Sequence, residues 1–260
     1  MTVPTPDLSF IMPCYNEEEV IGYTIPRFIA AFRKAGHTLE LVAVDNGSRD
    51  RTGAILHELR ADYPEIVPCR VEVNQGYGNG VLAGIPLARG AWVGIIPCDG
   101  QVDAEDVVLL YEAARATNGQ VVAKVRRRFR MDGIKRKLIS TAYQLFVRML
   151  WPRLGTIDVN GSPKILPRGV LTRMGLESKG WLLDPELMVK AQYANLRVLE
   201  LNVFARMRGA GVSHVRASTC WEFLSVLLGA RLTGRWRLPP PAPSPDAPVT
   251  AIHPGGRPAR

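Results

Sequence analysis

The chain has 260 residues, a formal net charge of +9 at pH 7 and a hydrophobic fraction of 47%. This length and apolar content predict a folded chain with a sizeable core and exclude an intrinsically disordered one. The basic excess indicates an anionic partner: nucleic acid, a phosphorylated small molecule or an anionic membrane surface. The four cysteines (Cys14, Cys69, Cys98 and Cys220) form no Cys-x-x-Cys pair, so they indicate a reducing compartment rather than a disulfide framework or a zinc site.

The sequence predicts neither a signal peptide nor a membrane-spanning segment. The N-terminus lacks the basic and apolar regions of a signal peptide, and no stretch approaches ~18 uninterrupted apolar residues. We therefore expect a cytoplasmic protein. The segment after Trp236 is rich in proline and poor in apolar residues, which predicts that residues 237–260 are disordered.

Strands and helices alternate along the first 125 residues. Apolar runs predict strands at residues 8–13, 39–44, 66–73, 92–96 and 121–125. Amphipathic patterns predict helices at residues 50–62 and 103–117, a glycine-rich helical segment between the third and fourth strands, and a first helix with Asn16 as its N-cap, a kink or restart at Pro26 and its end at Gly36. The alternation predicts an α/β fold with a mostly parallel central sheet flanked by helices.

Polar residues follow each of the first four strands, in the segments 13–17, 45–52, 74–80 and 99–101. Taken singly, each segment is also typical of a plain turn or helix cap. The carboxyl ends of parallel strands meet at one edge of the sheet, where such folds bind ligands. Hard oxygen ligands such as those of Asp99 and Gln101 suit Mg²⁺ or Mn²⁺ carrying phosphates. The glycines follow the third strand rather than the first, which argues against a dinucleotide fingerprint, and the four segments together predict a nucleotide-containing ligand.

Several segments, taken together, resemble the family 2 glycosyltransferases with the GT-A fold. They are IMPCYNEEEVI, VDNGSRDRT, NQGYGNGVLAG and IIPCDGQVDAED, followed by VRRRFRMDGIKRKLIS, DVNGSPKILPR, GWLLDPELMVKA and RGAGVSH. The resemblance covers about residues 7–232 and is closest to the dolichol-phosphate-mannose-synthase-like branch, which transfers sugars to polyprenyl phosphates. It implies a GT-A domain over residues 7–236, with a nucleotide-sugar-binding half (7–125) and an acceptor half (126–236).

The resemblance also implies roles for individual residues. It assigns binding of the donor nucleotide to Pro13, Tyr15, Asn16, Glu17, Asp45, Asn46, Ser48, Gly76 and Gly78. It assigns Mg²⁺ or Mn²⁺ to Asp99 and Gln101, and catalysis to Asp99 together with Arg208, which would stabilise the leaving diphosphate.

The chain departs from the family pattern at three positions. Pro97 stands where the metal motif usually has its first acid, Asn46 replaces the second acid after strand two, and His214 stands where the family often has lysine. Proline offers no side-chain ligand, so Asp99 and Gln101 would hold the ion with phosphates and water.

A run of eight basic residues between Lys124 and Lys137 contains a single acid, Asp132. A solvated loop and a nucleic-acid patch are both possible for such a run, but no known nucleic-acid-binding module accompanies it, and we expect no nucleic-acid partner. The resemblance favours an acceptor-phosphate site, formed by Arg126, Arg127, Arg136 and Ser140, that also contacts anionic lipid. Apolar stripes at residues 138–151 and 221–228 are either core faces or membrane-interface faces, and with the resemblance they predict peripheral membrane association.

The predicted reaction is inverting transfer of a sugar from a nucleotide diphosphate sugar (GDP-mannose or UDP-hexose) to a polyprenyl phosphate. A phosphate monoester has a second pKa near ~6, so it is a charged nucleophile at neutral pH and needs no general base. A sugar-hydroxyl acceptor would need a carboxylate base, for which Asp184 and Glu186 are the candidates. Transfer to a hydroxyl, or a degenerate nucleotide-sugar-binding protein, remains the alternative.

Overall fold

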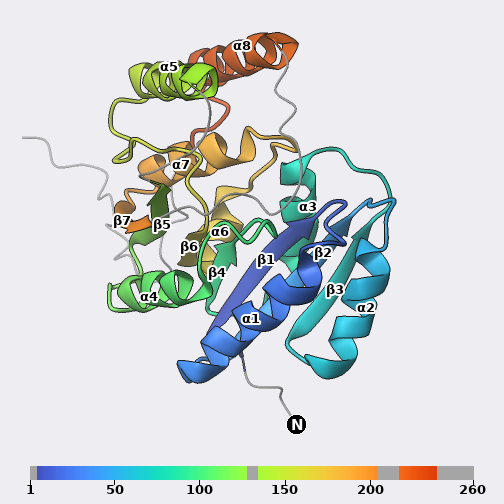
Figure 1. Ribbon diagram of the computed structural model, residues 1–260. Coiled ribbons are helices and arrows are strands. Elements are labelled where there is room, and N and C mark those ends of the chain that lie inside the picture. The colour runs from blue at the N-terminus through green and yellow to red at the C-terminus, as the bar shows by residue number, and fades with distance from the viewer. Residues whose placement is uncertain (1–4, 128–133, 204–216, 239–260) are drawn as a thin grey trace, which may run out of the picture.

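The computed structural model describes residues 5–127, 134–203 and 217–238. Within them, one seven-stranded sheet runs through the molecule in the order β3-β2-β1-β4-β6-β5-β7 (Figure 1). The strands are β1 (Leu8–Cys14), β2 (Leu39–Asn46), β3 (Ile66–Val71), β4 (Trp92–Ile95), β5 (Val121–Arg127), β6 (Lys164–Pro167) and β7 (Arg197–Val203). Only β6 is antiparallel to its neighbours, and the other described pairs are parallel. The predicted mostly parallel α/β sheet is therefore confirmed.

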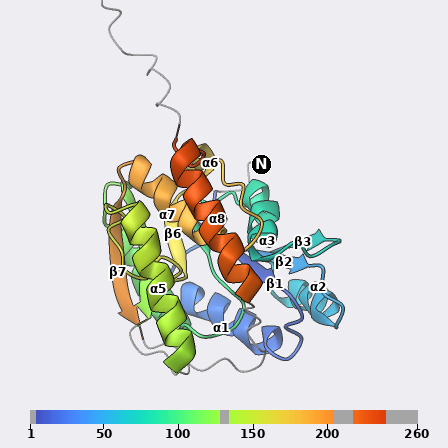
Figure 2. The ribbon, with the colours of Figure 1, turned by 90° about the horizontal axis from the view of Figure 1, so that it is seen from above.

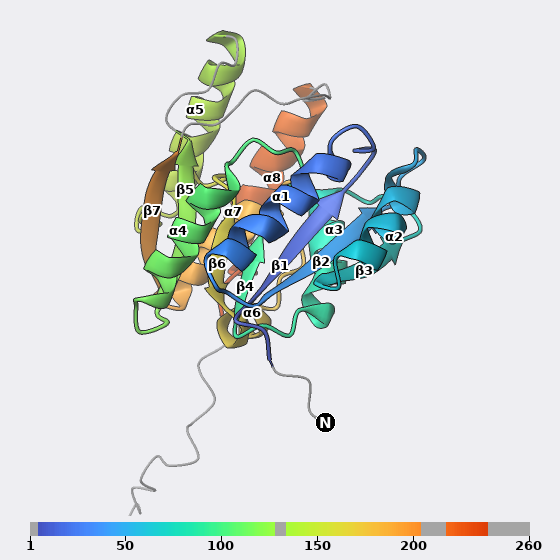
Figure 3. The ribbon, with the colours of Figure 1, turned by 60° about the horizontal axis from the view of Figure 1, so that its bottom comes forward.

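Helices cover both faces of the sheet. They are α1 (Ile21–Lys34), α2 (Thr52–Asp62), α3 (Tyr77–Gly84), α4 (Ala104–Arg115), α5 (Ile134–Leu150), α6 (Arg168–Met174), α7 (Leu183–Tyr193) and α8 (Ala217–Thr233), with a short 3-10 turn at Ile85–Leu87. Helices α1, α2 and α4 pack on one face, and α3, α6 and α7 on the other (Figures 1 and 3). Because both faces are covered, β1 and β2 read as nearly continuous buried runs rather than as alternating ones.

The strand register brings the carboxyl ends of β1, β2, β3 and β4 to the same edge. Cys14 pairs with Asp45, and Asn46 pairs with Val71. The backbone N–H of Ile96 donates to the carbonyl of Ile11, which keeps the segment after β4 beside β1. Strand β5 runs in the same direction as β4, so its end at Arg127 reaches this edge as well. Helices α5 and α8 lie side by side over the edge (Figures 1 and 2).

The first helix begins later than the sequence predicts. Asn16 has a left-handed backbone with φ 53°, and the helix starts at Ile21 with Val20 at its N-cap position. The prediction of Asn16 as N-cap is wrong, because its side chain instead accepts a hydrogen bond from the Arg49 backbone N–H. The helix runs through Pro26 without a restart, and Gly36, with φ 75°, follows its end as predicted.

The predicted disordered tail and the domain boundary near residue 236 stay predictions, because residues 239–260 lie outside the described part of the chain.

Candidate functional site

The loops after β1 and β2 are hydrogen-bonded to each other at the carboxyl edge of the sheet. The backbone N–H of Asn16 donates to Ser48 Oγ at 3.2 Å, and that of Glu17 donates to Thr52 Oγ1 at 2.9 Å. The structure thus brings Asn16, Glu17 and Ser48 together. Tyr15 beside them is 45% exposed and available to a ligand.

Asp45 is buried at the end of β2 and faces α2. Its Oδ1 accepts from the Ser48 backbone N–H at 2.9 Å, and its Oδ2 is 3.0 Å from Arg70 Nη1. A Cβ atom at Gly53 would lie 2.6 Å from Asp45 Oδ2, so the glycine makes room for the carboxylate. These contacts fix the carboxylate at the edge, and a carboxylate has about four lone-pair sites, which leaves acceptor capacity for a ligand.

Asn46, the next residue of β2, faces the opposite side of the sheet. Its Nδ2 donates to the Gly76 carbonyl at 3.0 Å. Its Oδ1 is buried without a hydrogen-bond partner among the described residues. A Cβ at Gly80 would lie 2.9 Å from Pro13 Cβ, which places Pro13, Asn46 and the start of α3 in one packed group.

The glycines at the start of α3 have a packing role that the sequence did not reveal. Gly76 has φ 111°, and a Cβ on it would lie 2.7 Å from the Lys179 carbonyl oxygen. A Cβ on Gly78 would lie 2.2 Å from the Ser178 carbonyl oxygen. The Asn79 backbone N–H donates to the Lys179 carbonyl at 2.7 Å. Close approach of residues 178–180 therefore accounts for both glycines, and their contact with a nucleotide stays a prediction.

The two acids that could serve a hydroxyl acceptor lie in buried ion pairs. Glu186 is fully buried, and its carboxylate accepts from Lys190 Nζ at 2.6 Å and from the backbone N–H groups of residues 177–178 at 2.8–3.2 Å. Asp184 Oδ1 lies 2.5 Å from Lys164 Nζ, and both side chains are buried. The geometry therefore gives both carboxylates a structural partner.

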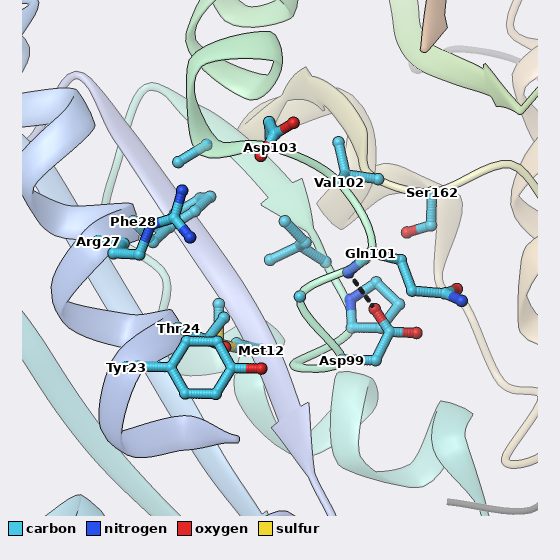
Figure 4. Close-up of a pocket in the computed structure, with 14 residues that line it drawn as sticks. Met12, Tyr23, Thr24, Arg27, Phe28, Asp99, Gln101, Val102, Asp103 and Ser162 are labelled. Carbon is cyan, nitrogen blue, oxygen red and sulfur yellow. Dashed lines mark hydrogen bonds between the residues drawn. The ribbon is translucent and has the colours of Figure 1, made fainter. Parts of the chain in front are cut away.

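A pocket opens beside the segment that follows β4 (Figure 4). Its walls are α1 on one side and residues 96–104 on the other, with Ser162 at the margin. Asp99 and Gln101 both line it, and Asp99 Oδ1 accepts from the Gln101 backbone N–H at 3.2 Å (Figure 4). Ser162 Oγ donates to the Ile95 carbonyl at 3.1 Å, which ties the chain entering β6 to the end of β4.

The donor atoms in this pocket fit a divalent cation bound together with a diphosphate. Pro97 lines the pocket but has no side-chain ligand, and the buried Cys98 is not among the lining residues. Across the described ranges, no cluster of three or more His, Cys, Asp or Glu side chains could hold a metal. Asp99 supplies a carboxylate and Gln101 an amide oxygen, and Asp103 adds a second carboxylate to the lining. Mg²⁺ is commonly held by one or two carboxylates with phosphates and water, which this set allows.

The structure places only part of the predicted acceptor site. Arg126 is half-buried at the end of β5, on the same edge as Asp99, and Ser140 is half-buried in α5. For Arg127 and Arg136 only the backbone is described, and Arg208 and His214 lie outside the described residues.

Two groups at the edge were missed from the sequence. Tyr23, Thr24 and Arg27 of α1 line the pocket, and their spacing on one side of a helix that follows the first strand was the available signal. Tyr77 and Trp181 stack with ring centroids 5.6 Å apart and planes 10° apart. No local pattern signals that stack, because its two residues are far apart in the chain.

Relatives and solved structures are similar to this chain. A family model described as glycosyl transferase family 2 matches residues 9–174. An undecaprenyl-phosphate 4-deoxy-4-formamido-L-arabinose transferase of Pectobacterium atrosepticum is 35% identical over 144 residues, which cover 55% of this chain and 43% of that protein. A dolichol-phosphate mannosyltransferase of Pyrococcus furiosus is 28% identical over 223 residues, covering 84% and 61%. The chain thus spans less than half the length of the first of these relatives and under two thirds of the second.

The crystal structure of glucosyl-3-phosphoglycerate synthase from Mycobacterium tuberculosis, in complex with Mn²⁺, uridine diphosphate and phosphoglyceric acid, superposes with a TM-score of 0.65. It is 20% identical, and the match covers 90% of this chain and 80% of that one. This likeness establishes the GT-A fold that the sequence predicted. Because the family model spans well over half of its residues, the chain belongs to glycosyl transferase family 2.

Proposed function

We propose that the chain transfers a sugar from a nucleotide diphosphate sugar, GDP-mannose or UDP-hexose, to the phosphate of a polyprenyl phosphate, with inversion at the anomeric carbon. The names of the two relatives, one an undecaprenyl-phosphate transferase and the other a dolichol-phosphate mannosyltransferase, support this acceptor class.

The observation that carries the acceptor assignment is the pairing of the two acids of α7. A hydroxyl acceptor needs a general base within hydrogen-bond reach. Glu186 is bonded to Lys190 and to two backbone N–H groups, and Asp184 is bonded to Lys164. A phosphate acceptor needs no base, because it is already ionised at neutral pH. It needs cationic and hydroxyl donors, which we assign to Arg126, Arg127, Arg136 and Ser140.

The donor binds across the carboxyl edge of the sheet in this proposal. Asp45 and Ser48 hold the nucleoside with the help of residues 13–17, and Asn46 and the turn at residues 76–78 border it. The diphosphate lies at Asp99 and Gln101. A divalent cation bound there would neutralise the charge that develops on the leaving diphosphate. Arg208 would add a second positive charge at the same group.

The outer faces of α5 and α8 support association with a membrane surface. Five large apolar side chains on these helices are exposed: Leu145, Met149, Leu224, Leu228 and Leu232. Within each helix they are four residues apart, so they share a face. We propose that this face and the basic residues before α5 contact an anionic membrane at its cytoplasmic side. No helix in the described part of the chain is long and apolar enough to cross a bilayer.

Pro97 favours one second candidate, a nucleotide-sugar-binding protein without turnover, because it removes a metal-ligating acid. A transfer assay separates the two. The purified chain is incubated with Mn²⁺ or Mg²⁺, radiolabelled UDP-glucose or GDP-mannose, and undecaprenyl or dolichyl phosphate. If the chain is an enzyme, the labelled sugar should be extracted into organic solvent with the lipid and be released from it by mild acid. Label that stays on the donor, although the nucleotide sugar binds, would favour the binding protein.

A further inference from the structure

An exposed tryptophan stacks on a tyrosine beside the donor site. Trp181 lies in the segment before α7, and its indole is stacked on the ring of Tyr77, the first residue of α3. Trp181 nevertheless remains 55% exposed, whereas the tryptophans Trp151 and Trp236 are almost fully buried. Large aromatic side chains gain most of their stabilisation from burial, so an ordered but exposed indole is a feature that binding sites use.

The segment that carries Trp181 is held from two sides. From α3, the Asn79 backbone N–H donates to the Lys179 carbonyl at 2.7 Å, and in the turn before α3 Gln75 Oε1 accepts from Lys179 Nζ at 2.8 Å. From α7, Glu186 accepts the backbone N–H groups of residues 177–178. The indole is thus positioned by contacts within the protein, and a ligand that packs on it would meet a platform that is already ordered.

The platform lies on the side of the sheet away from Asp45. Adjacent residues of a strand face opposite sides, and Asp45 faces α2, where it contacts Gly53, while Asn46 faces α3, where it bonds Gly76. Gly76 in turn packs against residues 179–180, next to Trp181. A nucleoside held by Asp45 would lie on the other side, so the part of the donor that could pack on the indole is not the nucleoside.

We infer that the exposed face of Trp181, supported by Tyr77, packs against the pyranose ring of the sugar that is transferred. A pyranose presents C–H groups on its ring faces, and the face of an indole carries the negative part of its quadrupole, so the two attract. This inference rests on the proposed function and adds a specificity-determining contact for the sugar, distinct from those for the nucleotide and for the acceptor phosphate.

Titration calorimetry distinguishes a contact between Trp181 and the sugar from a contact between Trp181 and the nucleotide. UDP and UDP-glucose, and GDP and GDP-mannose, are titrated into the wild type, Trp181→Ala, Trp181→Phe and Leu109→Ala. Leu109 is an equally exposed apolar residue on α4 and is the matched control. Trp181→Ala should weaken the nucleotide sugar about two- to tenfold and leave the bare nucleotide unchanged. Trp181→Phe should recover most of the loss, and Leu109→Ala should show none.

Two results would overturn the inference. Equal weakening of bare nucleotide and nucleotide sugar would mean that the indole stacks on the base. Unchanged affinity of Trp181→Ala for both would mean that the platform holds no part of the donor. If the wild type binds none of the four compounds, the proposed function itself fails and the inference with it, which is a distinguishable result.

Fluorescence quenching gives a second test, in which the one variant used, Trp181→Phe, keeps an aromatic ring at this position. The acrylamide quenching of the wild type minus that of Trp181→Phe reports on this indole. The nucleotide sugar should protect it and the bare nucleotide should not. Protection by undecaprenyl phosphate alone would overturn the inference, since the platform would then belong to the acceptor.

Discussion

Replacing Glu186 by glutamine tests whether its carboxylate has a structural or a catalytic role. The side chain is fully buried, pairs with Lys190 Nζ at 2.6 Å and accepts two backbone N–H groups of the segment that leads to Trp181. Glutamine keeps the shape but brings an NH₂ group among these donors and leaves the buried Lys190 ammonium without its counter-charge. We expect a loss of stability with little direct effect on the chemical step.

The size of the effect follows from the burial of the pair. Removing one partner of a buried ion pair costs about 3–5 kcal/mol. In a domain of this size, each kcal/mol lowers Tm by about 2–4 °C, so a 3 kcal/mol loss lowers Tm by about 6–12 °C. The matched control is Glu105→Gln on the exposed first turn of α4, which should lower Tm far less, because only a weak interaction with the helix dipole is lost. The double variant Glu186→Gln/Lys190→Met should recover part of the loss, because it removes the uncompensated charge.

The assay measures Tm by calorimetry and kcat at a temperature where each variant is folded. We expect a lowered Tm and a kcat within a few-fold of wild type. A general base contributes about 10²–10⁴-fold. A folded Glu186→Gln variant with unchanged Tm and a kcat reduced by that factor would refute the reasoning and indicate a hydroxyl acceptor.

Further variants test the metal, the donor, the membrane face and a buried lysine. Asp99→Ala should abolish transfer, and a chelator should reproduce the loss, with Mn²⁺ or Mg²⁺ reversing it; a fully active variant would remove the metal assignment. Asp45→Ala should weaken nucleotide binding about tenfold to a hundredfold, while Arg70→Ala, which keeps the carboxylate, should weaken it less. Equal nucleotide affinity in the wild type and both variants would show that Asp45 does not contact the nucleoside. Leu228→Glu should reduce cosedimentation with phosphatidylglycerol vesicles without changing Tm, and unchanged cosedimentation would count against the α5–α8 face. Burial, followed by the charge of Lys164, lowers the pKa of Lys124 to about 8, so the folded protein loses this proton at a lower pH than the unfolded chain does. The free energy of unfolding of the wild type, relative to that of Lys124→Met, should therefore rise between pH 8 and pH 9.5, by at most about 1.4 kcal/mol per pH unit. A difference that does not change with pH would contradict this prediction.

The first half of the fold could be predicted because its signals are local. Strands β1 to β4 are short apolar runs that end in polar turns, and their parallel pairing places those turns together. Asn16 was misassigned because the decisive partner, Arg49, is distant in the chain.

The second half was less accessible to sequence reasoning. Strand β6 is four residues long and begins with a lysine, and lysine is rarely buried without a partner. That lysine, Lys164, is buried because Asp184 of α7 pairs with it, and Lys124 of β5 is likewise paired with Glu200 of β7. Such pairs are set by tertiary contacts: the apolar run predicted the strand at residues 121–125, but the charge pattern did not indicate that Lys124 is buried.

The same limit applies to the site. The residue types at the strand ends indicated a nucleotide and a cation, while the function of the glycines at residues 76–78 depended on a backbone segment about 100 residues further on. The pairing of Glu186 with Lys190 also depended on the fold, since an acid and a lysine four residues apart on a helix are usually exposed.

The most direct test of the central claim is the structure of the linkage in the product. We propose NMR of the product formed from a nucleotide sugar labelled with ¹³C at the anomeric carbon, with undecaprenyl phosphate as acceptor. We expect that the labelled carbon couples to a single phosphorus of a phosphodiester and has the anomeric configuration opposite to that of the donor. An anomeric carbon without phosphorus coupling, or one that retains the configuration of the donor, would contradict it.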